Sequence, residues 1–497
     1  MRHLVAPLGG LLLAALVFGP AGRGLPGGAV SAQAPAAPVE ALPRTALTPQ
    51  ARAAVRYQAD LAAVRTYRPA YSFWQHIFTI PDGNIIFGSA TDGRLLARFP
   101  TGGNWTSEAV WMDAGLRDVL AGLRLQSRLS QRRGQVELVL QPIVGAVVHN
   151  PTRGRFLSPH AERYGRFLAE WGAIYERFAV PAEIGLAQAI VESGLNGRAR
   201  SGAQALGFCQ WLRGNWSYLD RLAPNVIEAY NQTTQAPYCA AHLTILATMY
   251  GSFIPALSEH HAGGVNVGRT VINGERLGGA DPREQYLMGA EFVRGLRNIS
   301  IQRYRELFRT YGPRSFLYAE MVFGNTVNVV RLRDEMPQAE IFAMRAARDI
   351  PLTEVARTTG LSTDEVKRFN PALVRRVPAR ANLYLPSYVP EFGADVTFWR
   401  RPPSEAFDTV LGEFLDLEPG VTRWHEASFA PTLQGFERRF RDTGTEEGVV
   451  MATTLAYITS NLRTSRRAQI LEEFRSSGRI LQLFQQGLGE LGASLAR

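Results

Sequence analysis

The chain has 497 residues, of which 46% are hydrophobic and 20% are charged, and its formal net charge is +10. This length predicts about three domains with cores of their own, and the apolar content excludes both a disordered chain and a small module that depends on disulfides. No dense basic run alternates with aromatic residues, so we expect no nucleic-acid partner. A polyanionic polymer of the cell envelope suits the mild positive charge.

Residues 1–32 have the pattern of a secretory signal peptide. Arg2 supplies a positive start, an apolar stretch runs from Leu4 to Phe18, and Val30-Ser31-Ala32 forms a small-residue cleavage site, with Ala21 as a second candidate. The apolar stretch is shorter than the about 20 residues that span a membrane. We therefore expect export to the periplasm without a stable membrane anchor. The alternative is an uncleaved N-terminal anchor.

Residues 33–70 predict a linker rich in Ala and Pro followed by a helix, and residues 71–155 predict a small β-rich region. In the latter, apolar runs at 77–80, 85–87 and 95–99 are separated by turn-forming residues, the pattern of an antiparallel meander. A helix over 114–129 and an extended segment over 136–148 are expected to complete the region. It shows no group of residues that would carry chemistry.

Three further segments follow. Residues 156–330 contain amphipathic stretches of helical length separated by Gly-rich loops, residues 338–388 have a short mixed α/β pattern, and residues 389–497 are again helical, notably over 405–417 and 465–491. The chain therefore predicts a multidomain α+β protein with a mainly α domain at its centre.

Cys209 and Cys239 are the two cysteines of the chain. In an exported protein, a pair separated by a modest loop favours a disulfide. The alternative is a metal site, because Cys239 and His242 have a C-x-x-H spacing to which Cys209 could add a ligand. A closed zinc site needs a further ligand, and no second pair stands nearby. We expect the disulfide and no metal.

Glu192 is the principal candidate for a catalytic group. Pro181 suits the start of a helix, Glu183 falls in its first turn, and Gly194 suits its end, so Glu192 lies in the last turn of a mostly apolar helix. Partial burial and the negative end of the helix dipole both raise a carboxyl pKa there. A carboxylic acid that stays protonated near neutral pH can protonate a glycosidic bond. The alternative is a solvated Glu at a helix end.

Two motifs in this region resemble those of soluble lytic transglycosylases, lysozyme-like enzymes that cut peptidoglycan. Residues 187–196 (AQAIVESGLN) resemble the Glu-Ser motif, and residues 201–211 (SGAQALGFCQW) resemble the second motif, a Gly-rich turn that leads into Gly-x-x-Gln. The resemblance implies that Glu192 is the catalytic acid/base and that Ser193 supports the neighbouring loop. It implies that Gln210 contacts the N-acetyl group of the sugar. Cys209 replaces the methionine of the family.

The third motif of the family, Ala-Tyr-Asn-Ala-Gly, is matched only loosely by residues 259–264 (EHHAGG). In this alignment His260 takes the place of the active-site tyrosine and His261 that of the asparagine, and both would bind substrate. Adjacent histidines also allow a metal site, but no partnered carboxylate stands at a suitable spacing. Tyr286 resembles a tyrosine near the end of the family's domain and is expected either to face Glu192 or to lie in the core. The role of Glu259 is left open.

The resemblance implies a reaction that needs no cofactor. Glu192 would protonate the bond between N-acetylmuramic acid (MurNAc) and N-acetylglucosamine (GlcNAc), and would then deprotonate the carbon-six hydroxyl, which closes a 1,6-anhydro ring. The partner is the glycan strand of peptidoglycan. Two alternatives stay open: a peptidoglycan-binding scaffold without activity, and a hydrolase similar to goose-type lysozyme.

Residues 341–386 resemble a degenerate LysM domain, a peptidoglycan-binding βααβ unit. The resemblance rests on Leu361-Ser362, Phe369-Asn370-Pro371 and the closing Leu383-Tyr384-Leu385-Pro386, whereas the usual Gly-Asp-Thr opening is Arg348-Asp349-Ile350. The unit is expected either to bind glycan or to serve only as a packing domain. The order of the two domains is similar to that of the membrane-bound lytic transglycosylase D family.

Overall fold

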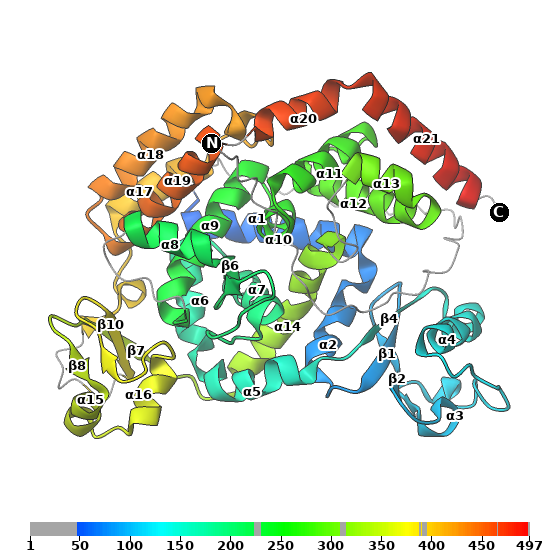
Figure 1. The fold of residues 1–497 in the computed structure, drawn as a ribbon, viewed down its shortest axis with the longest axis horizontal. Helices are drawn as coiled ribbons and strands as arrows, with labels where there is room; N and C mark the ends of the chain where they lie inside the picture. Colours follow the sequence, from blue (N-terminus) through cyan, green and yellow to red (C-terminus); the bar gives the residue numbers. More distant parts are fainter. Residues whose placement is uncertain are drawn as a thin grey trace, which may run out of the picture.

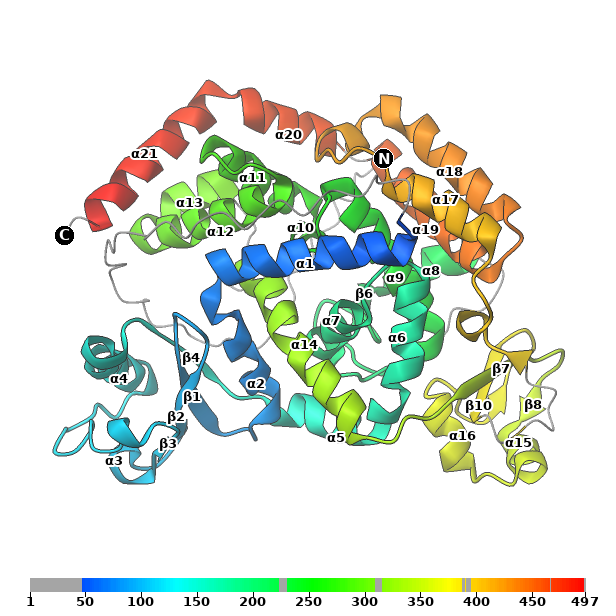
Figure 2. The ribbon, with the colours of Figure 1, turned by 180° about the vertical axis from the view of Figure 1, so that it is seen from behind.

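The computed structural model describes residues 47–222, 230–308, 315–386, 389, 395–464 and 466–495. The predicted signal peptide and the Ala/Pro-rich linker lie outside these residues. The described chain is predominantly helical with small antiparallel sheets, in agreement with the predicted α+β class. Two small units that contain β-strands lie at opposite ends of a helical body, and the C-terminal helices arch over that body (Figures 1 and 2).

The N-terminal part consists of one long helix and a four-stranded sheet with short helices. Its elements are α1 (Pro49–Tyr67), the 3-10 helix η2 (Pro69–Trp74), α2 (Gln75–Thr79), β1 (Asn84–Ser89), β2 (Leu95–Pro100), α3 (Trp105–Glu108), β3 (Val110–Trp111), η3 (Ala114–Leu116), α4 (Leu129–Val144) and β4 (Val147–Pro151). The strand order is β3-β2-β1-β4 and every pairing is antiparallel. The predicted meander is therefore present at 84–100.

Three elements predicted in this part are wrong. Residues 77–79 belong to helix α2, and residues 136–144 belong to helix α4. In α4, Val136 and Leu140 are both fully buried and stand four residues apart, a helical spacing that the many β-branched neighbours obscured. The helix expected over 114–129 is limited to η3 before the chain turns, with Gly122 at a φ of 73°.

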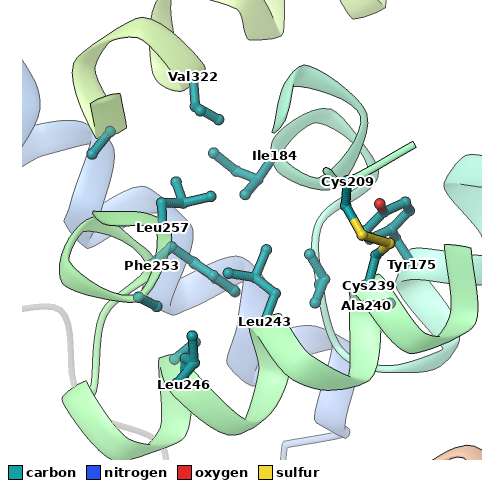
Figure 3. Close-up of a cluster of buried hydrophobic side chains, with 14 of the residues drawn as sticks. Tyr175, Ile184, Cys209, Cys239, Ala240, Leu243, Leu246, Phe253, Leu257 and Val322 are labelled. Atoms are coloured by element: carbon teal, nitrogen blue, oxygen red, sulfur yellow. A yellow bond between two sulfur atoms is a disulfide. The ribbon is translucent and has the colours of Figure 1, made fainter. Parts of the chain in front are cut away.

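The central body contains the helices that follow the sheet. They are α5 (Gly154–Tyr164), α6 (Leu168–Arg177), α7 (Ala182–Ser193), α8 (Arg213–Leu222), α9 (Gln232–Tyr250), α10 (Phe253–Ala262), α11 (Gly264–Arg276), α12 (Pro282–Ile299), α13 (Ile301–Phe308) and α14 (Tyr318–Glu335), with the short strands β5 (Ala205–Leu206) and β6 (Trp211–Leu212) between α7 and α8. Helix α7 lies in the middle. Figure 3 shows Ile184 of α7 facing Leu257 of α10 and Leu243 of α9 in the core.

Residues 341–386 contain two consecutive helices, as in the predicted strand–helix–helix–strand unit, but with two strands instead of one on each side of them. The elements are β7 (Ile341–Arg345), β8 (Ile350–Pro351), α15 (Leu352–Thr359), α16 (Thr363–Phe369), β9 (Arg376–Val377) and β10 (Asn382–Pro386), and β11 (Asp395–Val396) extends the sheet in the antiparallel order β10-β7-β11. This unit has a core of its own, which includes Val355, Val366 and Leu383. Its Phe369 ring packs on Phe167 of the central body at 4.8 Å.

The C-terminal part is helical, as predicted. It contains η7 (Phe398–Arg400), α17 (Glu405–Leu415), η8 (Arg423–His425), η9 (Ala427–Phe429), α18 (Ala430–Asp442), α19 (Glu446–Thr464), α20 (Arg467–Ser476) and α21 (Gly478–Leu495). The expected helix over 465–491 is thus divided at Ser477. Helix α19 packs on α9, α20 on α11 and α21 on α12, so the main hydrophobic core continues from α1 to α21 across the boundaries predicted at 156–330 and 389–497.

Within the described residues, no single helix has the length and apolar character to cross a membrane. Helices α9 and α10 taken together, bent by 119°, meet those criteria by length and composition alone.

The predicted disulfide between Cys209 and Cys239 is present and joins the chain before β6 to helix α9 (Figure 3). Because it closes a loop of 30 residues, replacing both cysteines with Ala is expected to lower the free energy of unfolding by about 3.6 kcal/mol. Urea denaturation of the oxidised parent and of the double variant measures this difference. The parent in reductant is the control and should approach the variant, whereas equal midpoints for parent and variant would contradict the prediction.

Candidate active site

Helix α7 places Glu192 at its C-terminal end. The helix starts after Pro181 and stops at Gly194, which adopts the left-handed conformation with a φ of 58°. A Cβ atom at position 194 would lie 2.1 Å from the carbonyl oxygen of Phe156, so only glycine fits. Every residue of α7 except Glu183 is buried. The helix is therefore enclosed by the protein, and Glu192 is carried in its last turn as predicted.

The carboxyl group of Glu192 has few polar neighbours. The Tyr318 hydroxyl, in the first turn of α14, donates to Glu192 Oε1 at 2.5 Å. His260 Nε2 and His261 Nδ1 lie 3.8 and 4.0 Å from the same oxygen. Burial raises the pKa of Glu192 to about 7, against the opposing effect of the hydrogen bond from Tyr318. At neutral pH a large fraction of Glu192 thus carries a proton.

Both histidines next to Glu192 are neutral at pH 7. Burial lowers the pKa of His260 and of His261 to about 4. The indole N–H of Trp211 donates to His260 Nδ1 at 3.3 Å, and His260 Nε2 lies 2.8 Å from the carbonyl oxygen of Cys209. These two contacts select the tautomer with the proton on Nε2, which donates to Cys209. His260 therefore holds the Cys209 loop instead of offering a free group to a sugar.

His261 has a different environment. Its ring stacks on Tyr318 with ring centroids 4.5 Å apart and an interplanar angle of 5°, and it lines the cavity next to Glu192. The stack fixes the Tyr318 hydroxyl toward Glu192. The two predicted histidines are thus brought to Glu192, but they perform separate tasks.

Ser193 and Gln210 both act on the loop that joins α7 to α8. Ser193 Oγ lies 2.9 Å from the carbonyl oxygens of Ala189 and Phe208, so it ties the end of α7 to that loop. The side-chain amide of Gln210 donates to the carbonyl oxygens of Ala199 and Gly207 at 3.1 and 2.9 Å. Gln210 is buried and does not line the cavity at Glu192, so its amide N–H groups serve the loop where the resemblance implied a sugar contact.

The tyrosine that reaches Glu192 is Tyr318, and Tyr286 occupies the second of its two expected places, in the core. Tyr286 is buried in α12 and does not line the cavity. Each tyrosine lies near the start of an α-helix, so the sequence offered no local signal that separates them. Their difference is one of tertiary placement, because α14 packs along α7.

A cavity of about 580 Å³, which includes space open to solvent, adjoins Glu192. From the central body it is lined by Val191, Glu192, His261, Tyr318 and Met321, and from the N-terminal part by Trp74, Ile77, Phe78, Asn150 and Arg153. Residues 71–155, in which the sequence shows no group of residues that would carry chemistry, thus form one wall of the candidate site. These residues are scattered over η2, α2 and the end of the sheet, which is why no motif marked them.

Glu259, whose role the sequence left open, belongs to a buried ion pair. Arg467 of α20 donates to Glu259 Oε1 and Oε2 at 2.5 and 2.8 Å, and the Tyr250 hydroxyl donates to Glu259 Oε2. Burial raises the Glu259 pKa, but the charge and hydrogen bonds of Arg467 outweigh it, so the pKa is lowered. Glu259 therefore stays ionised and fixes α10, which carries both histidines, to the C-terminal helices.

The side chains that could ligate a metal ion do not form a metal site in the part of the chain that the structure describes. Among residues 47–495, leaving aside the stretches that are not described, no group of three or more His, Cys, Asp and Glu side chains is placed to hold a metal ion. The sulfur atoms of Cys209 and Cys239 are bonded to each other, so they are not available as thiolate ligands beside His242.

No protein-family model matches this chain, and no curated protein matches it.

The raised pKa of Glu192 predicts a pH-dependent stability. Because the folded pKa of about 7 exceeds the unfolded value of about 4.3, the stabilising effect of the proton is complete below the unfolded pKa and is lost as the pH rises through the folded pKa. Gln cannot ionise. The stability of Glu192→Gln relative to the parent is therefore expected to increase by roughly 2 kcal/mol between pH 5 and pH 8.

Urea denaturation of both proteins across this pH range measures the effect. Glu183→Gln, at the one position of the same helix that is not fully buried, is the matched control, and its difference from the parent should change little with pH. A constant difference between Glu192→Gln and the parent would show that Glu192 is not held protonated.

Proposed function

We propose that the chain is a peptidoglycan lytic transglycosylase that cleaves the MurNAc–GlcNAc bond and leaves 1,6-anhydromuramic acid. The observation that carries the proposal is a buried glutamic acid with a pKa raised to about 7 in the wall of a cavity. A general acid works best when its pKa lies near the working pH. The Glu-Ser and Gly-x-x-Gln motifs support the same assignment.

In the proposed reaction Glu192 is first an acid and then a base. Its Oε1 accepts the hydrogen bond from Tyr318, so Oε2 is the oxygen that presents the proton to the glycosidic oxygen. The C1–O bond of MurNAc breaks, GlcNAc leaves with the proton, and the N-acetyl group of MurNAc stabilises the positive charge at C1. Glu192 then takes the proton of the carbon-six hydroxyl while that oxygen bonds to C1. The acid is restored and no water is consumed.

The neutral histidines suit this use of Glu192. A protonated imidazole within 4 Å would favour the carboxylate and lower its pKa. Because burial lowers the pKa of His260 and His261 to about 4, neither adds a positive charge near pH 7. Tyr318 keeps its proton as well, because burial and the proximity of Glu192 raise its pKa well above the ordinary value. The site thus holds a protonated carboxyl without a counterion.

The carboxyl groups among the described residues of the cavity wall favour a transglycosylase over a two-carboxylate hydrolase. Glycosidases of the latter kind place their carboxyl groups roughly 5 to 10 Å apart on either side of the bond. Among the described residues that line the cavity, Glu192 is the only carboxyl group. Glu259, close by in sequence to the histidines, is occupied by Arg467. Ring closure by the sugar's own hydroxyl needs only Glu192.

We further propose that residues 338–388 form a LysM-like unit. The consecutive helices α15 and α16, which stand in the chain between the paired strands β7 and β10, support the assignment. Asn370 supports it as well, because its side chain accepts from the Tyr384 N–H at 2.7 Å and donates to the Tyr384 carbonyl oxygen at 2.6 Å. The proposed substrate lies in the cell envelope, which agrees with the export predicted for residues 1–32.

Glu192→Gln is expected to reduce product formation by about 10² to 10⁴-fold, because Gln can neither donate nor accept the proton. Purified cell-wall sacculi are incubated with each protein and the soluble products are analysed by mass spectrometry. The parent should release anhydro-muropeptides, and Glu183→Gln should match the parent. Products with reducing ends would indicate a hydrolase similar to goose-type lysozyme. Sacculi that are bound but not cut would indicate a binding scaffold.

Tyr318→Phe is expected to move the alkaline limb of the pH profile. In the parent, kcat/KM should fall as the pH rises through about 7, because Glu192 must be protonated in the free enzyme. The hydrogen bond from Tyr318 lowers the Glu192 pKa, so its removal should shift this limb to higher pH. Tyr286→Phe, also a buried tyrosine, is the control and should leave the limb in place. If Tyr318→Phe lowers kcat/KM by the same factor at every pH and leaves the alkaline limb in place, the assignment of this limb to Glu192 is contradicted.

A further inference from the structure

We propose that Arg153 forms a subsite for a carboxylate on the lactyl–peptide arm of the muramic acid residue. This inference rests on the proposed function and names the part of the substrate that the N-terminal wall recognises. Arg153 lines the same cavity as Glu192. In the chain, Arg153 lies between the end of β4 and the start of α5.

The position of Arg153 is fixed relative to Glu192 by packing. The Arg153 N–H donates to the carbonyl oxygen of Ile77 at 2.7 Å, which ties it to α2. Three residues later, the backbone of Phe156 abuts Gly194 so closely that a side chain there would collide with it. The backbone at Arg153 is therefore held next to α2 and close to the end of α7, which carries Glu192.

The guanidinium group is held by an aromatic stack. Its central carbon lies 4.8 Å from the centroid of the Phe156 ring, which in turn packs on Phe78 at 5.4 Å. A cation over a ring is attracted by the π-electrons and keeps its N–H groups at the edge available for hydrogen bonds. Phe78 also lines the cavity, so Phe156 connects two residues of the cavity wall, Phe78 and Arg153.

Arg153 forms no ion pair with any described carboxylate. The charge of Asp82 affects the pKa of Arg153, but the Asp82 carboxylate forms no ion pair with it and accepts a hydrogen bond from the backbone N–H of Arg155. By contrast, Arg177, Arg283 and Arg467 are partly or fully buried and each binds a carboxylate, at 2.5, 2.6 and 2.5 Å respectively. A half-buried cation that faces a cavity without such a partner can take one from the ligand.

The chemistry of a guanidinium group selects a carboxylate as that ligand. Its planar donors match the two oxygens of a carboxylate in a bidentate geometry. In peptidoglycan GlcNAc is uncharged, whereas MurNAc carries a lactyl ether that ends either in a free carboxylate or in a peptide with carboxylates of its own. Trp74, Ile77 and Phe78 supply apolar surface next to Arg153, which suits the faces of sugar rings. Arg153 would thus distinguish muramic acid from a neutral amino sugar.

The test measures binding in a Glu192→Gln background, where the glycan is not consumed. Calorimetry compares glycan oligomers that carry peptides, oligomers freed of peptides with a free lactyl carboxylate, and the same oligomers with methyl-esterified carboxylates. Adding Arg153→Gln should weaken binding of one or both carboxylate forms by roughly tenfold or more and should leave binding of the esterified form unchanged. The form that loses affinity identifies the source of the carboxylate.

Arg155→Gln is the matched control, because Arg155 is exposed and lies two residues from Arg153, and the substitution removes the same charge. It should bind all three oligomers as the Glu192→Gln protein does. Arg153→Lys keeps the positive charge but loses the planar group that stacks on Phe156. It should retain part of the affinity for carboxylates, which would show that the affinity lost in Arg153→Gln does not come from the lost stack alone. Equal affinity with and without Arg153, or an equal loss for carboxylate and ester forms, would overturn the proposal.

The outcome is separable from that of the proposed function. If binding depends on the carboxylate and on Arg153 but the parent releases no anhydro products, the subsite proposal stands and the transglycosylase proposal is refuted. If the parent releases anhydro products but binding does not depend on Arg153, the transglycosylase proposal stands and the subsite proposal is refuted. A protein that neither binds nor cuts the glycan would refute both.

Discussion

A carboxyl group buried without a counterion is the constraint on which the rest of the site depends. The chain neutralises its other buried acids with arginine, as in Asp60 with Arg283 and Glu259 with Arg467. Glu192 receives only a tyrosine hydroxyl and two histidines that burial keeps neutral. Ionising such a group is costly, so it keeps its proton to an unusually high pH. The same burial that weakens the fold at high pH is what would make Glu192 an acid.

Keeping that environment requires segments from the whole chain. Helix α14 supplies Tyr318 and α10 supplies the histidines, while the ion pair between Glu259 and Arg467 holds α10 against α20. Removing one partner of a buried pair of this kind typically costs about 3 to 5 kcal/mol. This explains why the C-terminal helices share the main core. They hold in place the helix that carries the histidines, although none of their described residues lines the cavity.

The sequence predicted features that depend on neighbouring residues and missed those that depend on distant contacts. Helix α7, its stop at Gly194 and the cysteine pair have local signals: an apolar run, a residue that allows positive φ, and a sensible loop length. Tyr318 and Arg153 have none, because their significance lies in which helix packs on α7 and which loop abuts Gly194. Helix α4 was missed for a similar reason. Its β-branched residues favour a strand, and the helical spacing of its buried residues, Val136 and Leu140, becomes visible only in the structure.

The residues expected to touch sugar through the second and third motifs largely hold the loop after α7 in place. That loop contains Leu195, Gln204 and Gln210, all with positive φ, a conformation that side chains rarely adopt. It persists because Ser193 and His260 bond its carbonyl oxygens and the disulfide fixes its end. With those groups committed to the loop, contacts to a ligand in the cavity fall to the residues that line it. One wall of the cavity comes from the N-terminal part, so its selectivity would depend on a region outside the motifs.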